Sequence, residues 1–279
     1  MSRKFPAVAA RGARLAFVAR SCPLERVSSE RRTFLERSLA GVRPKVRADV
    51  TPPARALTDG LWVVQRMIQV PPRIDIPATT TVIRLCDGTL LVHSPFRLDP
   101  ALRRELGALG TVAHLVAPNA FHYLYLGEHH AAFPAAAIHL APGLRERQPS
   151  VPAGTTLGEV PPASWQGEIE LAVLGPTRGV AEVAFLHRPS ATLVLTDLAF
   201  NMQTATNAIG RLYWRFSGVW QRFGPTRLVD RVLLRDPALV RSFLARILGW
   251  DFTRIVVSHG DVVERDARRV FEEAFAKYR

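Results

Sequence analysis

Three polar residues of this sequence are candidates for binding one metal ion, because each follows an apolar stretch typical of a buried strand. They are His122 after residues 113–117, Asp197 after 192–196 and His259 after 254–258. Polar side chains at the ends of neighbouring strands often converge on one edge of an α/β sheet. Two imidazoles and one carboxylate suit a divalent ion and leave a coordination position open for water.

The elements that must position these residues are two hairpins. Strand patterns at 79–85 and 89–93 flank Asp87-Gly88, a dipeptide that favours a tight turn because glycine accepts positive φ. Residues 180–186 and 192–196 predict a second hairpin, which leads directly to Asp197.

Helices are predicted between and after these hairpins. Asp99-Pro100 and Asp236-Pro237 are N-cap signals, and apolar residues at helical spacing follow each of them. The first helix should end near Gly107 or Gly110, and the second should run through Leu248. Strands that alternate with helices in this way indicate an α/β architecture.

The residues at the strand ends resemble the metallo-β-lactamase superfamily, over about residues 60–279. In that family one strand ends in His-x-His-x-Asp-His, a later hairpin ends on a bridging Asp, and a final strand ends in Gly-His or Ser-His-Gly. Residues 193–197 (Leu-Val-Leu-Thr-Asp) resemble the bridging-Asp strand, and residues 256–260 (Val-Val-Ser-His-Gly) resemble the last one. The resemblance implies an αβ/βα four-layer sandwich.

The first motif of the family is degraded in this chain. Ala117, Asn119 and Phe121 stand where the family has His, His and Asp, and His122 alone remains. The later family His is also missing, because Arg178 or a neighbour occupies its place. The pattern Ala-Pro-Asn-x-x-His is similar to an uncharacterised, divergent branch of the superfamily. What remains implies at most one metal ion (zinc, iron or manganese), bound by His122, Asp197 and His259.

Further residues are candidates for completing such a site. His93 and Glu182 are candidate additional ligands, and Asp261 is a candidate for orienting His259. For His93 and Glu182, a role as hydrogen-bonded structural residues is the alternative. In catalysis Asp197 would also orient the attacking water, and Asn119 would donate a hydrogen bond to the developing oxyanion.

An aromatic and arginine-rich stretch follows the Asp197 strand and is a candidate substrate lid. Its leading residues are Trp214, Arg215 and Trp220. Such a segment suits an acidic substrate, stacked nucleobases or a lipid surface. The alternative is a pair of helices whose aromatic side chains pack inward while arginine stems cover apolar surface.

Charge and composition indicate a domain with an N-terminal extension. Residues 1–50 hold twelve Lys and Arg against four Asp and Glu, so they carry +8 of the formal net charge of +13. We predict a basic, disordered extension over residues 1–56 and the folded domain over 57–279. No apolar run reaches the roughly 18 residues of a membrane span. Cys22 and Cys86 are too few for a disulfide framework, and a cytoplasmic location is expected.

These observations favour metal-dependent hydrolysis of an ester, lactone, thioester or phosphoester. The alternative is a metallo-β-lactamase-like binding protein that holds no metal and performs no catalysis. A third hypothesis, nucleic-acid binding through the basic arm, ranks last because no nucleic-acid motif accompanies the charge. The sequence specifies neither the small-molecule substrate nor the oligomeric state.

Overall fold

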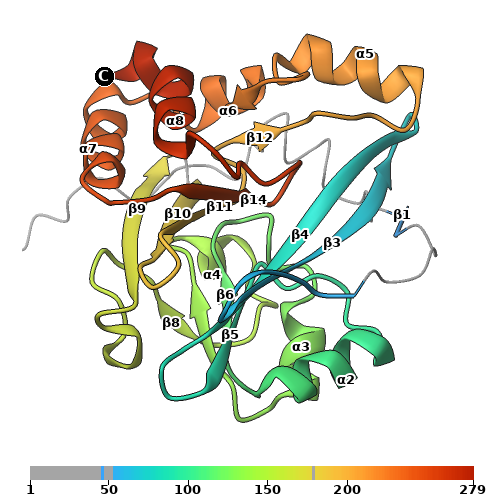
Figure 1. The fold of residues 1–279 in the computed structure, drawn as a ribbon, viewed down its shortest axis with the longest axis vertical. Helices are drawn as coiled ribbons and strands as arrows, with labels where there is room; N and C mark the ends of the chain where they lie inside the picture. Colours follow the sequence, from blue (N-terminus) through green and yellow to red (C-terminus); the bar gives the residue numbers. More distant parts are fainter. Residues whose placement is uncertain (1–44, 47–52, 178–179) are drawn as a thin grey trace, which may run out of the picture. The chain divides into compact units, whose positions relative to one another are not determined.

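The computed structural model describes residues 45–46, 53–177 and 180–279 (Figure 1). Most of the predicted N-terminal extension, 1–56, lies outside the described residues. One short strand lies within that range and a second begins in it, at residue 55, and both pair with the first long strand of the domain.

The first sheet has eight strands, in the order β1-β3-β4-β5-β6-β7-β8, with β2 also paired to β3. Its strands are β1 (Lys45–Val46), β2 (Arg55–Thr58), β3 (Leu61–Val70), β4 (Ile74–Arg84), β5 (Thr89–His93), β6 (Thr111–Ala117), β7 (Ala137–Leu140) and β8 (Thr155–Thr156). The hairpin predicted around Asp87-Gly88 is confirmed by the antiparallel pairing of β4 with β5. Gly88 has φ +82°, and the Asp87 carboxylate accepts the backbone N–H of Thr89 at 2.8 Å.

The second sheet has the order β14-β11-β10-β9. Its strands are β9 (Ile169–Thr177), β10 (Val180–His187), β11 (Thr192–Leu195) and β14 (Arg254–Val257). The second predicted hairpin is confirmed by the antiparallel pairing of β10 with β11. β11 and β14 are parallel, with Leu195 opposite Val257. Because parallel strands end at the same edge, the residues that follow β11 and β14 emerge side by side.

The remaining elements are helices and a small two-stranded sheet. They are α2 (Pro100–Leu109), α3 (Leu126–Ala132), α4 (Leu144–Arg147), η1 (Ala163–Trp165), β12 (Phe200–Asn201), α5 (Ala208–Ser217), β13 (Phe223–Gly224), α6 (Arg227–Val232), α7 (Pro237–Leu248), α8 (Ala267–Phe275) and η2 (Ala276–Tyr278). The predicted N-caps are confirmed, since the Asp99 and Asp236 side chains accept backbone N–H groups of α2 and α7. None of the described helices is long and apolar enough to cross a membrane.

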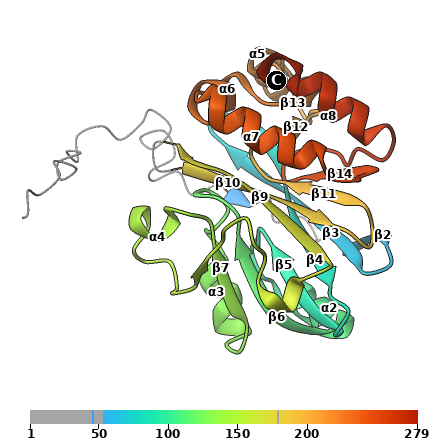
Figure 2. The same cartoon turned by 90° about the vertical axis from the view of Figure 1, so that its left-hand side faces the viewer.

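The layers follow the order helix, sheet, sheet, helix (Figure 2). α2 and α3 cover the first sheet, and α7 and α8 cover the second. This arrangement confirms the predicted αβ/βα four-layer sandwich.

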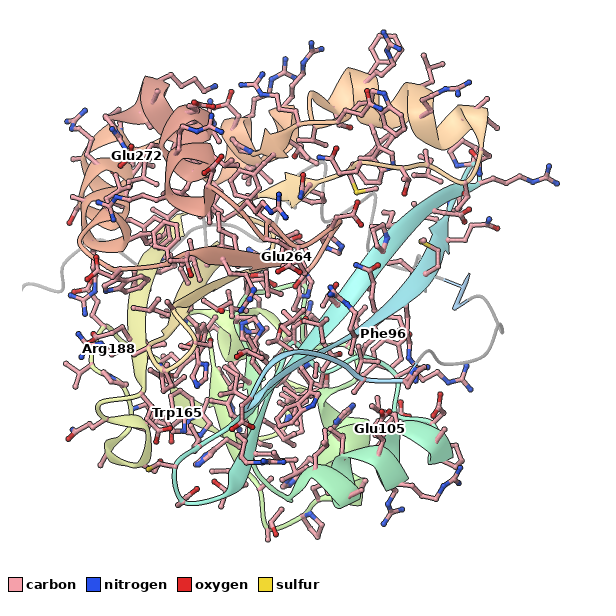
Figure 3. All side chains as sticks on the ribbon, viewed as in Figure 1. Phe96, Glu105, Trp165, Arg188, Glu264 and Glu272 are labelled. Carbon is pink, nitrogen blue, oxygen red and sulfur yellow. The ribbon has the colours of Figure 1, made fainter. Side chains whose placement is uncertain are left out.

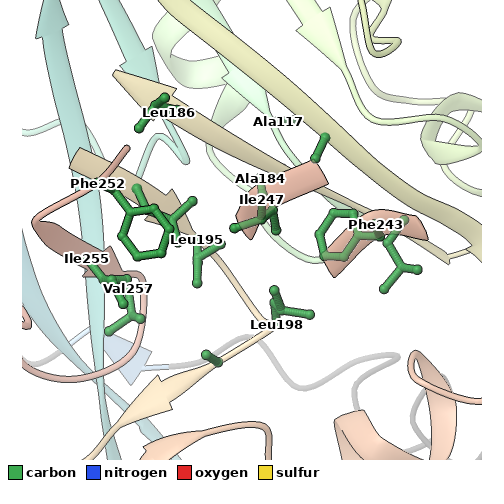
Figure 4. Packing of buried hydrophobic residues seen from close by; sticks show 14 of the residues in the cluster. Ala117, Ala184, Leu186, Leu195, Leu198, Phe243, Ile247, Phe252, Ile255 and Val257 are labelled. Carbon is green, nitrogen blue, oxygen red and sulfur yellow. The ribbon is translucent and has the colours of Figure 1, made fainter. Parts of the chain in front are cut away.

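The apolar core follows the alternation of side chains along the strands. On β5, Leu90 and Val92 face the helical layer, whereas Leu91 belongs to the cluster between the two sheets. On the other side, Phe243 and Ile247 of α7 pack in the outer cluster around the second sheet (Figure 4). Each sheet therefore buries both of its faces.

Trp165, labelled in Figure 3, is fully buried and belongs to the same cluster as Leu91. Its ring packs edge-on against His114 at 5.4 Å and lies 4.4 Å from the ring of His139. Nδ1 of His114 lies 3.1 Å from Nε2 of His139. These two histidines are therefore part of the packed interior.

We propose that the folded domain does not require residues 1–44. Their removal leaves every described contact in place, so the thermal midpoint should stay within about 2 °C of that of the full chain. Removing residues 1–58 also strips β1 and β2 from β3 and deletes the hydrogen bond from the Ala54 N–H to Glu105 at 2.7 Å. That longer deletion should lower the midpoint by about 4 °C or more. Equal losses from the two deletions, measured by calorimetry, would contradict the proposed boundary.

Candidate metal site

The structure brings together the three residues that the sequence singled out. Nε2 of His122 lies 3.3 Å from Oδ2 of Asp197, and Nε2 of His259 lies 3.2 Å from Oδ1 of the same carboxylate. One ligand atom from each residue falls within 4.8 Å of the others. Two atoms bound to one zinc ion at about 2.0–2.2 Å lie roughly 3.4 Å apart in tetrahedral geometry. The two His–Asp pairs, at 3.3 and 3.2 Å, match that spacing, whereas a pair 4.8 Å apart must close by roughly 1 Å to share one ion.

His259 reaches this cluster because of a close backbone approach just after β14. Gly260 has φ +124°, and a methyl group on it would lie 2.2 Å from the carbonyl oxygen of Asn201. The N–H of Asn201 donates to the carbonyl of His259 at 3.0 Å, and the N–H of Asp261 donates to the carbonyl of Asn201 at 2.9 Å. Only glycine fits between these two hydrogen bonds.

The ring of His259 has a defined tautomer. Its Nδ1 lies 2.7 Å from the carbonyl oxygen of Pro77, which accepts only, so Nδ1 carries a hydrogen. A neutral ring therefore turns the lone pair of Nε2 toward the Asp197 carboxylate. Two acceptors at 3.2 Å repel each other unless a proton or a metal cation lies between them. The ring of Phe200 stacks on the imidazole of His259, with the two ring centroids 4.9 Å apart.

His122 is held by two polar residues. Its Nδ1 lies 2.6 Å from the hydroxyl oxygen of Ser94. The side-chain oxygen of Asn119 accepts the backbone N–H groups of Phe121 and His122, at 2.8 and 2.9 Å. Asn119 thus shapes the turn that carries His122 toward the site.

The amide nitrogen of Asn119 links the site to a buried carboxyl group. It lies 2.7 Å from Oδ2 of Asp197, 2.8 Å from Oε2 of Glu182 and 3.1 Å from the Thr196 hydroxyl. An amide has two hydrogens, and three acceptors already surround them. Asn119 is therefore placed to orient Asp197, and the predicted hydrogen bond to an oxyanion would require one of these bonds to break.

Glu182 holds the end of β11 in place. Its Oε1 accepts the backbone N–H groups of Thr196 and Leu198, at 3.0 and 3.3 Å, and also the Thr196 hydroxyl. These bonds fix the backbone on both sides of Asp197. Glu182 is not part of the group of candidate ligands, which consists of His122, Asp197 and His259.

The two carboxyl groups differ in electrostatics. Burial raises the pKa of Glu182 to about 7, and the nearby charge of Asp197 adds to the rise. Burial also acts to raise the pKa of Asp197, but His122 and His259 outweigh it and hold that pKa well below its usual range. Asp197 is therefore the carboxylate that carries negative charge toward the two imidazoles.

The other predicted ligands lie outside the cluster. His93 is buried against Phe185, with ring centroids 4.8 Å apart, and burial lowers its pKa to about 3. Within the described part of the chain neither of its ring nitrogens has a hydrogen-bond partner. Asp261 is exposed, and the carbonyl of Pro77 makes the hydrogen bond to His259 that Asp261 was expected to make.

The predicted lid is divided between the interior and the surface. Trp214 is 1% exposed and packs with Ile74, Met202 and Val219, so no substrate can touch it. Arg215 and Trp220 remain accessible and line a shallow hollow of about 310 Å³ together with Gly218 and Gln221. The three candidate ligands do not line that hollow.

Sequence reasoning missed the residues that orient the ligands. Ser94 follows His93 in the sequence, and Thr196 precedes Asp197. This adjacency to candidate site residues is the one sequence feature that could have pointed to them. Pro77 contributes a backbone carbonyl from a strand 182 positions away from His259, and no residue-type pattern reveals such a contact.

Comparison with solved structures defines the class of fold. The chain is similar to the DIM-1 metallo-β-lactamase exposed to ceftazidime, at 12% identity over 83% of this chain and 100% of that one, with a TM-score of 0.56. It is similar to the FIM-1 metallo-β-lactamase from Pseudomonas aeruginosa in the mono-zinc form, at 12% identity over 81% and 96%, with a TM-score of 0.54. The Flv1 flavodiiron core from Synechocystis sp. matches at 11% identity over 84% and 61%, with a TM-score of 0.55. The fold is therefore metallo-β-lactamase-like.

A family model assigns the chain more narrowly. The chain belongs to the family described as Domain of unknown function (DUF4336), whose model matches residues 58–215. That range includes Asn119, His122 and Asp197 and ends before His259. A search of curated proteins found no match.

Gly260→Ala tests the close approach that positions His259. The added methyl group collides with the Asn201 carbonyl, so the variant should lose roughly 1–3 kcal/mol or more of unfolding free energy. Gly127→Ala is the matched control, because nothing lies within 4 Å of its new Cβ in α3. Urea unfolding of both variants measures the difference. Equal stability of the two variants would show that the backbone around Asn201 shifts to make room for the methyl group without a cost in unfolding free energy.

Proposed function

We propose that this protein is a metal-dependent hydrolase that binds at most one divalent ion through His122, Asp197 and His259. The observation that carries the proposal is the convergence of these three side chains, with ligand atoms within 4.8 Å of one another. The hydrogen bond from His259 to Pro77 supports it, because it places a hydrogen on Nδ1 and leaves Nε2 as the ring nitrogen that could bind an ion.

The surrounding residues favour one ion rather than two. Ala117 and Phe121 have no ligand atoms in their side chains, and the Asn119 amide nitrogen already donates to Asp197 and Glu182. Glu182 itself is committed to Thr196 and Leu198. The zinc, iron or manganese ion that we propose would be bound by the two imidazoles and the Asp197 carboxylate.

A divalent ion in this position supplies a Lewis acid that makes water nucleophilic near neutral pH. Asp197, which is partly exposed, would accept a hydrogen bond from that water and orient it. Asn119 and Glu182 keep the Asp197 carboxylate in position. The substrate class that we propose is an ester, lactone, thioester or phosphoester.

The hydrogen bonds of Asn119 also favour a second candidate function. Asn119 already satisfies one oxygen of Asp197, so a proton on each imidazole would complete the network without any metal. In a binding protein with the same fold, His122, Asp197 and His259 would hydrogen-bond to one another, and the accessible lid residues Arg215 and Trp220 would contact the ligand.

Metal content separates the two functions. Purified protein should contain up to one equivalent of a divalent metal by elemental analysis. His122→Ala, Asp197→Ala and His259→Ala should each lose it, since each removes one of three ligands. His130→Ala is the control, because His130 lies on α3 outside the cluster. A folded, metal-free protein that takes up no zinc, iron or manganese on reconstitution would support the binding protein instead.

Ser94→Ala tests how the His122 ring is oriented. Removing the hydroxyl breaks the hydrogen bond to Nδ1 at 2.6 Å but leaves the ligand atom Nε2 untouched. Metal affinity, measured by competition with a chelator, should fall about 10–100-fold. The thermal midpoint of the apoprotein is measured alongside, because Ser94 is itself buried. Unchanged affinity in a folded variant would show that Ser94 does not orient His122.

A further inference from the structure

Helix α5 presents an apolar stripe to solvent. Ile209, Leu212, Tyr213 and Phe216 are 46, 56, 40 and 65% exposed, and their spacing of i, i+3, i+4 and i+7 places them on one face. Gly210 and Trp214 are the buried residues of the helix and lie on a face turned roughly 130° away from the stripe. The helix therefore has one apolar face that packs against the protein and a second apolar face that is exposed to solvent. Only the first face is needed to attach the helix to the domain.

Arginines border this stripe. Arg211 and Arg215 are exposed on the same helix, and within the described part of the chain neither has a carboxylate partner. Residues 200–235 contain six arginines and a single acidic residue, Asp230. Asp230 is itself engaged by Lys277 and by the Tyr278 hydroxyl, at 2.8 and 2.6 Å. The region around the stripe is thus strongly cationic.

The helix is preformed and firmly attached. The Asn207 side chain accepts the N–H of Gly210 at 2.7 Å at its start, and Gly218 ends it with φ +87°. Its buried Trp214 packs with Ile74 at the start of β4, and Figure 1 shows α5 lying across that end of the strand. The stripe is therefore already exposed to a partner, and the helix needs no rearrangement to present it.

We propose that α5 binds the surface of an anionic lipid bilayer, with its apolar stripe in the acyl boundary and its arginines on the headgroups. Exposed apolar residues flanked by arginine have the chemistry of an interfacial helix, and aromatic side chains such as those of Tyr213 and Phe216 suit that depth. This proposal does not depend on metal binding at His122, Asp197 and His259.

Two other occupants fit the stripe less well. A second copy of the chain would bring like-charged arginines together, and four side chains of one short helix fall short of the roughly 800 Å² per partner of a stable interface. Nucleic acid would use the arginines, but Ile209 and Leu212 offer nothing to phosphate groups. The bilayer is the partner that uses both the apolar and the cationic residues.

Cosedimentation of the full chain with vesicles of phosphatidylcholine and phosphatidylserine tests the proposal. The double variant Leu212→Gln, Phe216→Gln should reduce vesicle partitioning about tenfold or more, because two side chains no longer enter the acyl boundary. The control is Val160→Gln, Leu239→Gln, which changes two exposed apolar residues outside α5. The control should bind as the unmodified chain does, and both variants should keep its thermal midpoint.

Three outcomes would overturn the proposal. The first is no binding of the unmodified chain to these vesicles. The second is equal binding of the α5 variant, which would assign the affinity to another basic segment such as residues 1–44. The third is a concentration-dependent dimer in ultracentrifugation that the α5 variant abolishes while vesicle binding is absent. A tenfold loss confined to the α5 variant would support it, as would weaker binding to phosphatidylcholine alone.

Discussion

The buried carboxyl group of Glu182 is the interaction on which the site depends. It lies where the segment after β6 meets β10, because Asn119 and Glu182 form an isolated antiparallel bridge and the N–H of Val183 donates to the carbonyl of Pro118. A buried carboxyl group is costly unless its oxygens are hydrogen-bonded. Glu182 meets that need by accepting bonds from both sides of Asp197 and from Asn119. One side chain therefore couples sheet packing to the position of the central carboxylate.

This coupling explains how a reduced set of ligands still converges. Asp197 and His259 share an edge because β11 and β14 are parallel neighbours. His122 comes from the other sheet, and the turn that carries it is shaped by the same Asn119 that donates to Asp197. Hydrogen bonds from the backbone and from Ser94 and Asn119 thus bring the three candidate ligands together.

Much of this fold was predictable from sequence, because its signals are local. Asp87-Gly88 predicts a hairpin through its turn geometry, and Asp99 and Asp236 predict helix starts through their capping chemistry. The three candidate ligands were found because each follows a strand. The surrounding contacts were not predictable, because they join residues far apart in sequence. The bond from His259 to the Pro77 carbonyl depends on the pairing of whole layers. The prediction that Trp214 belongs to a substrate lid was wrong for a related reason. The sequence of an amphipathic helix does not show whether an aromatic residue faces the protein or solvent, and here Trp214 packs against Ile74 and Met202.

The central claim is that one ion occupies the space between His122, Asp197 and His259. A crystal structure of the protein grown with zinc, with diffraction data on both sides of the zinc absorption edge, tests it most directly. The account predicts one anomalous peak about 2.0–2.2 Å from Nε2 of His122, from Nε2 of His259 and from an Asp197 oxygen. A second peak beside Asn119, or no peak while these three side chains hydrogen-bond to one another, would contradict it.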